Sequence, residues 1–387
     1  MQTPMHETAL RVFVHLARGF GRAAWKERWD RGQIVGINHD DPYGYRQAEQ
    51  MGCSVQQSED PPEGRLMRLF RLATRALLGF DFWHAWSNRE GIFNADVVWT
   101  HTESQCLAVL LLARFRRSDA RRPAIIAQTV WVMDSWESYG APRRWFYRSL
   151  LRQADMLTFL SPSAAAKAQS LFPHQHVEFI KYGIRADQSL AIIDREKHAP
   201  IRILSMGTDR HRDWPTLIAA IRNDARYQAR AVTGAKIDAL LAGASNITKE
   251  RAKSNTELMA LLSWADVIVV PLVENLHASG ITVLEEAVLC GIPVIVTDVG
   301  GLRSYFDSQE VTYVRANDPQ GLRAAIDALM ADDETRRKKA ACALARMKQG
   351  DLNSRSFVAR HVELSQQLLH PSQIRKPSET FSAVARS

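Results

Sequence analysis

The chain has 387 residues, with 50 Lys and Arg against 42 Asp and Glu, which gives a net charge of +8. Its length predicts two domains, and its 46% hydrophobic and 24% charged residues are typical of a folded globular protein and exclude a disordered one. The four cysteines are scattered, which excludes a disulfide framework or zinc ribbon and favours a reducing cytoplasmic setting.

The longest apolar stretches are interrupted by charged residues, and no run approaches the ~20 apolar residues that cross a bilayer. The N-terminal stretch also lacks the basic start and apolar run of a signal peptide, so we expect a cytoplasmic protein without a transmembrane segment. The positive charge permits an anionic partner such as a nucleotide, a nucleic acid or a lipid headgroup. Because the basic residues form no RNA-binding motif, we expect no nucleic-acid partner.

Short apolar runs recur along the chain, each followed by a turn and a segment of helical periodicity. This alternation predicts an α/β protein whose parallel sheets are covered by helices on both faces. The strands are predicted at residues 11–16, 96–100, 124–130, 201–206, 267–270 and 293–297.

A polar segment between Tyr182 and Pro200 divides this pattern. It predicts two doubly wound parallel-sheet domains, over 1–190 and 200–350. Helical spacing predicts a further helix within 351–370, and the remaining 371–387 are expected to form a frayed tail.

Two features of the first half follow predicted strands. Gly19 and Gly21 come after the first strand, where glycine is expected in any doubly wound domain. His101 follows the strand over 96–100, so we expect it at the edge of a cleft, where it and Glu103 would orient hydroxyl groups. The alternative is a histidine that is hydrogen-bonded within its own loop.

Residues 64–80 place four arginines at three- and four-residue spacing among leucines, with no acidic residue. A basic amphipathic helix of this kind is typical of proteins that bind an anionic membrane surface, and 143–152 is a second basic patch. The alternative is a domain helix with a solvated basic face. If the helix binds a membrane, a lipid-linked acceptor is expected.

The segment over 261–301 carries the strongest chemical signal. Ser279, Gly280, Ile281 and Thr282 stand at a predicted helix start, where free N–H groups and the helix dipole favour an anion such as a diphosphate. Glu286 follows Thr282 by four residues and shares its helix face, so its carboxylate is placed to accept both hydroxyls of a ribose. The alternative is that it is a solvated acid favoured by the dipole.

The run LEEAVLCGIPVI over 284–295, followed by VGG over 299–301, resembles GT-B-fold retaining glycosyltransferases of the group that includes sucrose and glycogen synthases. The resemblance covers about 201–330. It implies two Rossmann-like domains that face a cleft, with the C-terminal helix packing back towards the first domain.

The resemblance also implies roles for individual residues. Glu286 would bind the ribose, the 279–282 loop the pyrophosphate, and Glu274 the donor sugar, although the family's two acidic residues are closer together than these. Gly19 and Gly21 would line the cleft that faces the donor. Asp134 stands where relatives often have a histidine, and would be an acceptor base or anchor.

The stretch SMGTDRHRD after the strand over 201–206 resembles the family's first turn of the donor domain. Gly207 would approach the donor, and Arg210 and Arg212 are candidates to stabilise the charge that builds on the departing diphosphate. The chain has no D-x-D metal motif, so we expect no metal ion and no cofactor besides the nucleotide-sugar substrate.

The resemblance thus implies a hexosyltransferase-type enzyme that transfers a sugar from a nucleotide-sugar to an acceptor hydroxyl, with retention. A saccharide or lipid-linked acceptor is expected, in polysaccharide or glycolipid assembly, and a peripheral position at the inner face of the membrane. Two alternatives stay open: a nucleotide-sugar epimerase on the same fold, and a non-catalytic nucleotide-sugar-binding partner.

Overall fold

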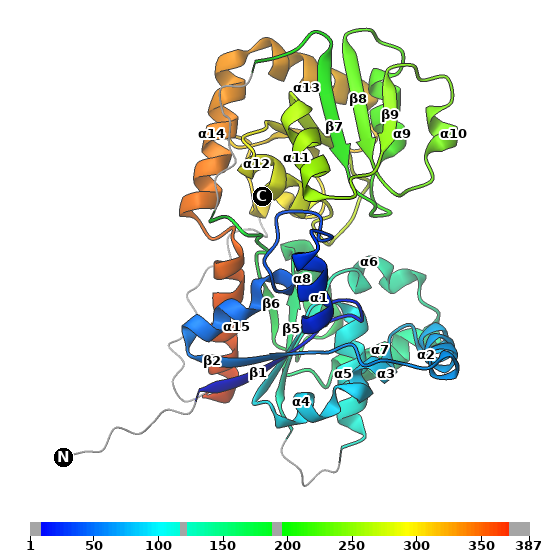
Figure 1. Cartoon of the computed structure of the whole chain (residues 1–387), viewed down its shortest axis with the longest axis vertical. Helices are drawn as coiled ribbons and strands as arrows, with labels where there is room; N and C mark the ends of the chain where they lie inside the picture. The colour runs from blue at the N-terminus through cyan, green and yellow to red at the C-terminus, as the bar shows by residue number, and fades with distance from the viewer. Residues whose placement is uncertain (1–8, 117–121, 188–195, 371–387) are drawn as a thin grey trace, which may run out of the picture.

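A computed structural model of the chain describes residues 9–116, 122–187 and 196–370. These residues form two halves, each a sheet with flanking helices. The N-terminal half lies below the C-terminal half in Figure 1. The frayed tail predicted over 371–387 lies outside the described residues, as does 188–195 of the predicted domain boundary.

The first sheet has six parallel strands in the order β2-β1-β3-β4-β5-β6. The strands predicted over 11–16, 96–100 and 124–130 are confirmed as β1, β3 and β4. Their ends differ from the predicted ones by at most one residue. The strand bounds are β1 Leu10–His15, β2 Cys53–Gln57, β3 Val97–Thr100, β4 Ala124–Thr129, β5 Met156–Phe159 and β6 Val177–Phe179.

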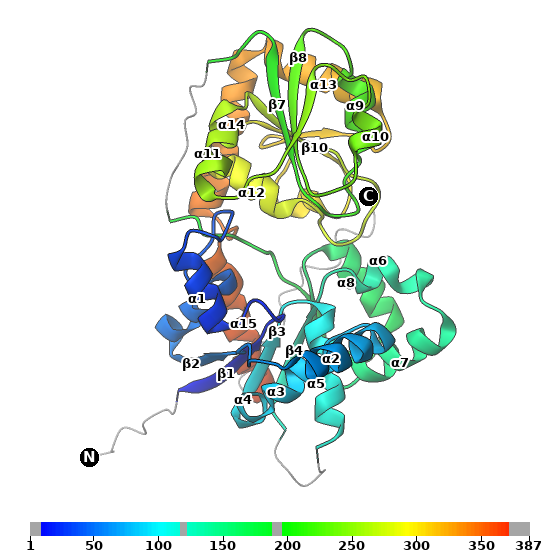
Figure 2. The ribbon, with the colours of Figure 1, turned by 45° about the vertical axis from the view of Figure 1, so that its right-hand side comes forward.

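Helices cover both faces of this sheet, as Figure 2 shows from a second side. The start of α8 illustrates their local signals, because Pro162 begins the helix and the Ser161 hydroxyl accepts a hydrogen bond from the N–H of Ala164. The helices are α1 Arg22–Asp30, η1 Pro42–Met51, α2 Arg65–Leu78, α3 Phe82–Ser87, α4 Arg89–Asn94, α5 Glu103–Arg114, α6 Val132–Ser135, η2 Trp136–Ser138, α7 Ala141–Leu151 and α8 Pro162–Leu171.

The second sheet also has six parallel strands, in the order β12-β11-β10-β7-β8-β9. The predicted strands over 201–206 and 267–270 match β7 and β10. The elements are β7 Ile201–Met206, α9 Trp214–Ile221, β8 Tyr227–Val232, α10 Asp238–Leu241, β9 Ile247–Glu250, α11 Asn255–Trp264, β10 Val267–Val270, α12 Ile281–Leu289, β11 Val294–Thr297, η3 Leu302–Ser304, β12 Thr312–Val314, α13 Pro319–Ala331 and α14 Asp333–Gln349.

The last helix, α15 (Ser354–Leu369), lies against the first sheet and its helices rather than the second (Figure 1). The indole N–H of Trp99 on β3 donates to the hydroxyl of Ser365 at 2.8 Å, and Phe357 packs on Tyr45 with ring centroids 5.7 Å apart. One buried apolar cluster contains side chains of both sheets and of α15, so the two halves share part of their core.

Each sheet changes its direction of growth once, between β1 and β3 in the first and between β7 and β10 in the second. Ligands of open parallel sheets bind beyond the carboxyl ends of the strands at these points. The loops that follow β7 and β10 are therefore where a site is expected. In the described part of the chain, none of the helices has the length and apolarity needed to cross a bilayer.

Candidate functional site

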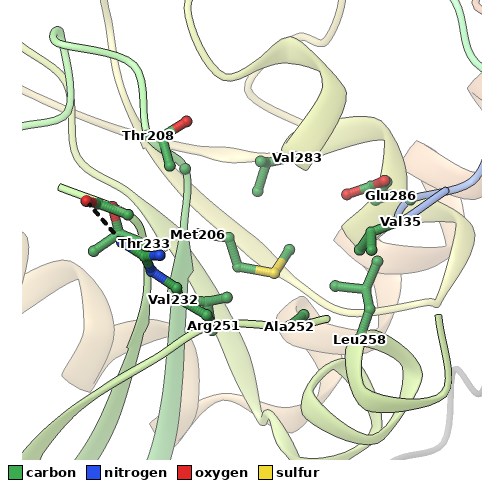
Figure 3. A pocket seen from close by; sticks show the side chains of 13 residues that line it. Val35, Met206, Thr208, Val232, Thr233, Arg251, Ala252, Leu258, Val283 and Glu286 are labelled. Atoms are coloured by element: carbon green, nitrogen blue, oxygen red, sulfur yellow. Dashed lines mark hydrogen bonds between the residues drawn. The ribbon is translucent and has the colours of Figure 1, made fainter. Parts of the chain in front are cut away.

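A cavity of about 590 Å³ lies between the two halves at the carboxyl edge of the second sheet (Figure 3). The second half provides most of its wall, including Gly207 and Thr208 after β7 and Glu286 on α12, while Val35 and Gly36 come from the first half. Figure 3 shows Glu286 and Val35 side by side, so the two halves meet at this carboxylate.

The Glu286 side chain is 7% exposed, and its Oε1 accepts a hydrogen bond from the N–H of Ile37 at 3.1 Å. Gly36 has a positive φ of 108°, and a Cβ there would lie 2.8 Å from the same oxygen. Only glycine therefore allows the first half to approach the carboxylate this closely. Burial raises the pKa of Glu286 to about 7, although the Ile37 N–H favours the charged form.

The start of α12 lies next to a buried arginine. Gly280 caps the helix with a φ of 87°, and a Cβ there would lie 2.8 Å from Nη1 of Arg212. The Arg212 side chain is 7% exposed, donates from Nε to the carbonyl of Met206 at 2.9 Å, and reaches the hydroxyl of Ser279 at 3.4 Å. A Cβ on Gly207 would lie 2.3 Å from its Nε, so glycine is required there too.

Arg212 has no carboxylate within ion-pair distance among residues 9–116, 122–187 and 196–370, although Asp209 acts on it from farther away. Burial lowers its pKa to about 10, so the guanidinium remains charged at neutral pH. A buried cation without a paired acid, beside a helix start, is suited to an anion.

Two of the backbone N–H groups predicted to bind a diphosphate already have an acceptor within the protein. The N–H of Ser279 already donates to the side-chain oxygen of Asn275, and that of Ile281 to the carbonyl of Ala278. Thr282 is exposed on the first turn of α12. The N–H groups of this turn have no acceptor inside the helix, so those of Gly280, Thr282 and the residue after it are the donors left for an anion among the described contacts.

A network of carboxylates and histidines joins the two halves beside the cavity. Asp134 of α6 accepts from the N–H of Leu276 at 2.7 Å and contacts Nδ1 of His277 at 2.8 Å, and Nε2 of His277 contacts Asp209 at 2.9 Å. Asp209 also holds His211 at 3.0 Å. Asp134 therefore occupies the position of an anchor between the halves.

The charges of this network support one another. Burial opposes the charged form of His277, but the carboxylates of Asp134 and Asp209 outweigh it and raise the pKa. Burial likewise opposes both carboxylates, yet the hydrogen bonds from His277 keep their pKa values below the ordinary range. The sequence had no signal for this network, because its members lie in three segments far apart in the chain.

Asp134, His211 and His277 also offer ligand atoms within 4.8 Å of one another, so a metal ion could be held here. Both ring nitrogens of His277 already face carboxylates, so these groups are satisfied as ion pairs without one.

Arg210 donates to the hydroxyl of Ser135 in the first half at 2.8 Å. It lines a second cavity of about 510 Å³, which shares Thr208 with the first cavity and is also bordered by Glu103 and Trp131. A third cavity of about 400 Å³ lies within the first half and shares Glu103 and Trp131 with the second. The three cavities therefore form a series that runs from the loop after β7 in the second half into the first half.

The structure does not place His101 at the edge of the cleft. Its side chain is 7% exposed, its Nδ1 is 2.9 Å from the hydroxyl of Tyr45, and its ring stacks on Tyr43 with centroids 3.6 Å apart. Burial lowers its pKa to about 3. The η1 segment folds over this histidine, which makes it a core residue.

Three further residues predicted at the site also lie elsewhere. Gly19 and Gly21 donate their N–H groups to Oδ2 of Asp60 at 2.9 and 3.2 Å, so a carboxylate of the same half occupies this loop. Glu274 is exposed and borders none of the three cavities, whereas Asn275 and Ser279, farther along the same loop, are buried.

Residues 238–343 match the model of the family Glycosyl transferases group 1. The predicted resemblance to this family is confirmed. The matched segment contains β10, α12 and β11, and thus Glu286 and the Gly280 helix start. The comparison with curated proteins found no match to the sequence.

Solved structures extend the likeness to the whole fold. Sucrose-phosphate synthase from Thermosynechococcus elongatus is 17% identical, covers 93% of this chain and all of its own, and superposes with a TM-score of 0.71. A UDP-forming trehalose-phosphate synthase from Burkholderia xenovorans is 13% identical over 93% of this chain and 99% of its own, with a TM-score of 0.64.

Anabaena HepE, solved in complex with UDP and glucose, is 14% identical over 91% of this chain and 98% of its own, with a TM-score of 0.59. At these identities the likeness shows the fold, which is GT-B as predicted.

Proposed function

We propose that this protein is a glycosyltransferase that moves a sugar from a nucleotide-sugar donor to an acceptor hydroxyl. The observation that carries the proposal is that the buried carboxylate of Glu286 lines the first cavity, while the buried guanidinium of Arg212, which has no acid partner among the described residues, lies directly against Gly207 of the same cavity wall. The family match over 238–343 supports it, and the UDP and glucose bound by HepE support a UDP-sugar as donor.

In this proposal the nucleoside occupies the first cavity, with its ribose hydroxyls on Glu286. The diphosphate lies at the start of α12, whose Ser279 hydroxyl is in reach of the Arg212 guanidinium, so that both act on it from the same side. As the bond to the sugar breaks, negative charge builds on the diphosphate, and a fixed, water-poor guanidinium stabilises that charge without moving.

The acceptor would enter from the first half. The second cavity, with Arg210 and Glu103, is where the donor sugar and the acceptor hydroxyl would meet, and the third cavity would hold the rest of the acceptor. We further propose a hexosyl donor, retention of configuration, independence of metal ions, and a cytoplasmic role in polysaccharide or glycolipid assembly with a saccharide or lipid-linked acceptor. The family resemblance supports these finer assignments.

Calorimetric titration with UDP-, GDP- and ADP-sugars tests the proposal. We expect the wild type to bind one of these donors and Glu286→Ala to bind it at least about tenfold more weakly, because two ribose hydrogen bonds are lost. The matched control is Glu334→Ala, an exposed glutamate on α14. Binding of no nucleotide-sugar, or equal binding by Glu286→Ala, would contradict the proposal, and conversion of the donor sugar without an acceptor would indicate the epimerase.

A further inference from the structure

Helix α2 exposes its apolar side chains and buries a charged one. Of its fourteen residues only Arg71 is buried, and it is held by Glu63 at 2.9 Å and by Asp81 at 2.6 Å. Leu66 and Leu77 are 84% and 78% exposed. A helix of a globular domain ordinarily turns its apolar stripe to the core, so this orientation requires an explanation.

The most exposed large apolar residues of α2 form one stripe. Leu66, Leu69, Phe70, Ala73 and Leu77 follow the spacing of one helix face, and Leu69 and Phe70 are 64% and 54% exposed. Arg71 points to the opposite side, into its two carboxylates. The helix is therefore fixed to the domain by ion pairs, with its apolar face outward.

The stripe continues onto neighbouring aromatic residues. Phe70 contacts Trp83 with ring centroids 5.3 Å apart, and Trp83 contacts Trp86 at 6.2 Å. Phe82, next to Trp83, contacts Phe115 at the end of α5. Trp86 and Phe115 are 40% and 68% exposed. We call Leu66, Leu69, Phe70, Leu77, Trp86 and Phe115 the α2 surface.

Figure 1 and Figure 2 both show α2 at the outside of the first half, beside α3 and α7. Helix α7 is joined to it by the hydroxyl of Tyr147, which donates to the carbonyl of Leu78 at 2.9 Å. On α7, Trp145 is 71% exposed. Tryptophan with an apolar body and a polar N–H is the residue type that favours the bilayer interface.

Cations accompany the apolar stripe of α2. Arg65 lies beside the stripe, Arg68 and Arg75 are exposed on the opposite, polar face of the helix, and the helix has no acidic residue. The guanidinium of Arg89 lies over Trp86 at 5.2 Å. Two copies of this face would bring like charges together, whereas an anionic lipid layer complements both its charge and its apolar stripe.

We propose that the α2 surface docks on an anionic lipid bilayer, with α2 lying in the headgroup region and its leucines inserted. The third cavity is lined by Arg75 and Gly79 at the end of α2, so it lies beside the docked helix. If that cavity holds the acceptor, a point that rests on the proposed function, a lipid-linked acceptor would reach it from the bilayer and meet Arg210 beyond Glu103.

Co-sedimentation of the full chain with phosphatidylcholine–phosphatidylglycerol vesicles tests the proposal, with pure phosphatidylcholine vesicles as the neutral arm. We expect binding to the anionic vesicles only, weakened by added salt. The triple variant Leu66→Gln/Leu69→Gln/Leu77→Gln should lower the partition coefficient by about tenfold or more. Arg65→Gln/Arg68→Gln should lower it by roughly fivefold for each charge, with little effect on folding.

Two controls lie in the second half: Leu240→Gln, at a leucine that is 40% exposed on α10, and Lys338→Gln on α14, and neither should alter the partition. Calorimetric binding of a UDP-sugar, measured on every variant, shows that the fold is kept and separates a failure here from a failure of the proposed function. The proposal is overturned if anionic vesicles are not bound, if neutral vesicles bind equally, or if both variants bind as the wild type does. A concentration-dependent dimer that the triple variant abolishes, without vesicle binding, would equally overturn it in favour of self-association.

Discussion

Two glycine loops occupy equivalent places in the two sheets, one after β1 and one after β7, and they hold opposite charges. The loop with Gly19 and Gly21 closes on the carboxylate of Asp60, which accepts two of its N–H groups. The loop with Gly207 closes on the guanidinium of Arg212, which has no acid partner in the described part of the chain.

The two loops follow equivalent strands, yet the difference in charge gives them different binding properties. Backbone N–H groups at a sheet's switch point favour an anion, and in the first half the domain supplies that anion itself. In the second half the loop instead presents a cation towards the start of α12, and this arrangement favours an anion that comes from outside. Only the second loop is therefore open to a diphosphate.

Removal of the cation should have the largest effect. Arg212→Met is expected to weaken UDP binding by about 2 kcal/mol or more, roughly thirtyfold, because a buried charged contact to the phosphates is lost. Calorimetry with UDP measures it. Arg28→Met is the matched control, since Arg28 is exposed and its guanidinium donates to the carbonyl of Gly19 in the other loop. Equal losses in both variants would contradict the distinction between the loops.

Removal of the anion from the first loop should affect stability instead. Asp60→Ala leaves the N–H groups of Gly19 and Gly21 without their acceptor, and we expect the free energy of unfolding to fall by about 1–3 kcal/mol with UDP affinity unchanged. Urea denaturation measures the first quantity and calorimetry the second. Asp60→Asn, which keeps an acceptor oxygen, should lose less; a fall in UDP affinity without destabilisation would mean that this loop binds the donor.

Protonation of Glu286 should change the UDP affinity by less than Arg212→Met does, and the pH controls its extent. Burial raises the pKa of Glu286 to about 7. The side chain that would accept the ribose hydroxyls is therefore mostly protonated at pH 6 and mostly ionised at pH 8. UDP affinity should therefore increase over this range by up to about tenfold. Calorimetry in matched buffers should show a flatter profile for Glu286→Gln, and an equally steep profile would assign the dependence to another group.

The smallest effect is expected at the junction of the halves. The pKa of His277 is raised in the folded state, so its stabilising charge is fully present below its unfolded value of about 6.5 and is lost as the pH rises through the folded pKa. Thermal unfolding of the wild type should thus lose about 1 kcal/mol of stability across this alkaline window relative to His277→Gln. Parallel curves for the two proteins would show that the network contributes no pH dependence.

Local sequence patterns correctly predicted the strands and the helix start that surround the site. The strands β7 and β10 and the start of α12 depend on apolar runs and on one glycine, and these signals lie within a few residues. Glu286 follows from helical geometry once that start is known, because its face is fixed by its spacing from Thr282.

Contacts between distant segments were beyond prediction. Asp60 meets Gly19 across 41 residues and Asp134 meets His277 across 143, and no periodicity encodes either pair. His101 was expected at a cleft because it follows a strand, but Tyr43 and Tyr45 cover it. For α2 the sequence indicated a basic amphipathic helix, yet its outward orientation depends on Glu63 and Asp81 reaching Arg71.

The hydrogen bond from Ile37 to Glu286 has a mechanical consequence for substrate entry. One oxygen of the carboxylate accepts the amide N–H of Ile37 from the first half, and in the proposed function a ribose diol would share the carboxylate with that amide. A single glutamate would then contact both the nucleotide and the first half, so binding of the nucleotide would be coupled to the contact between the two halves.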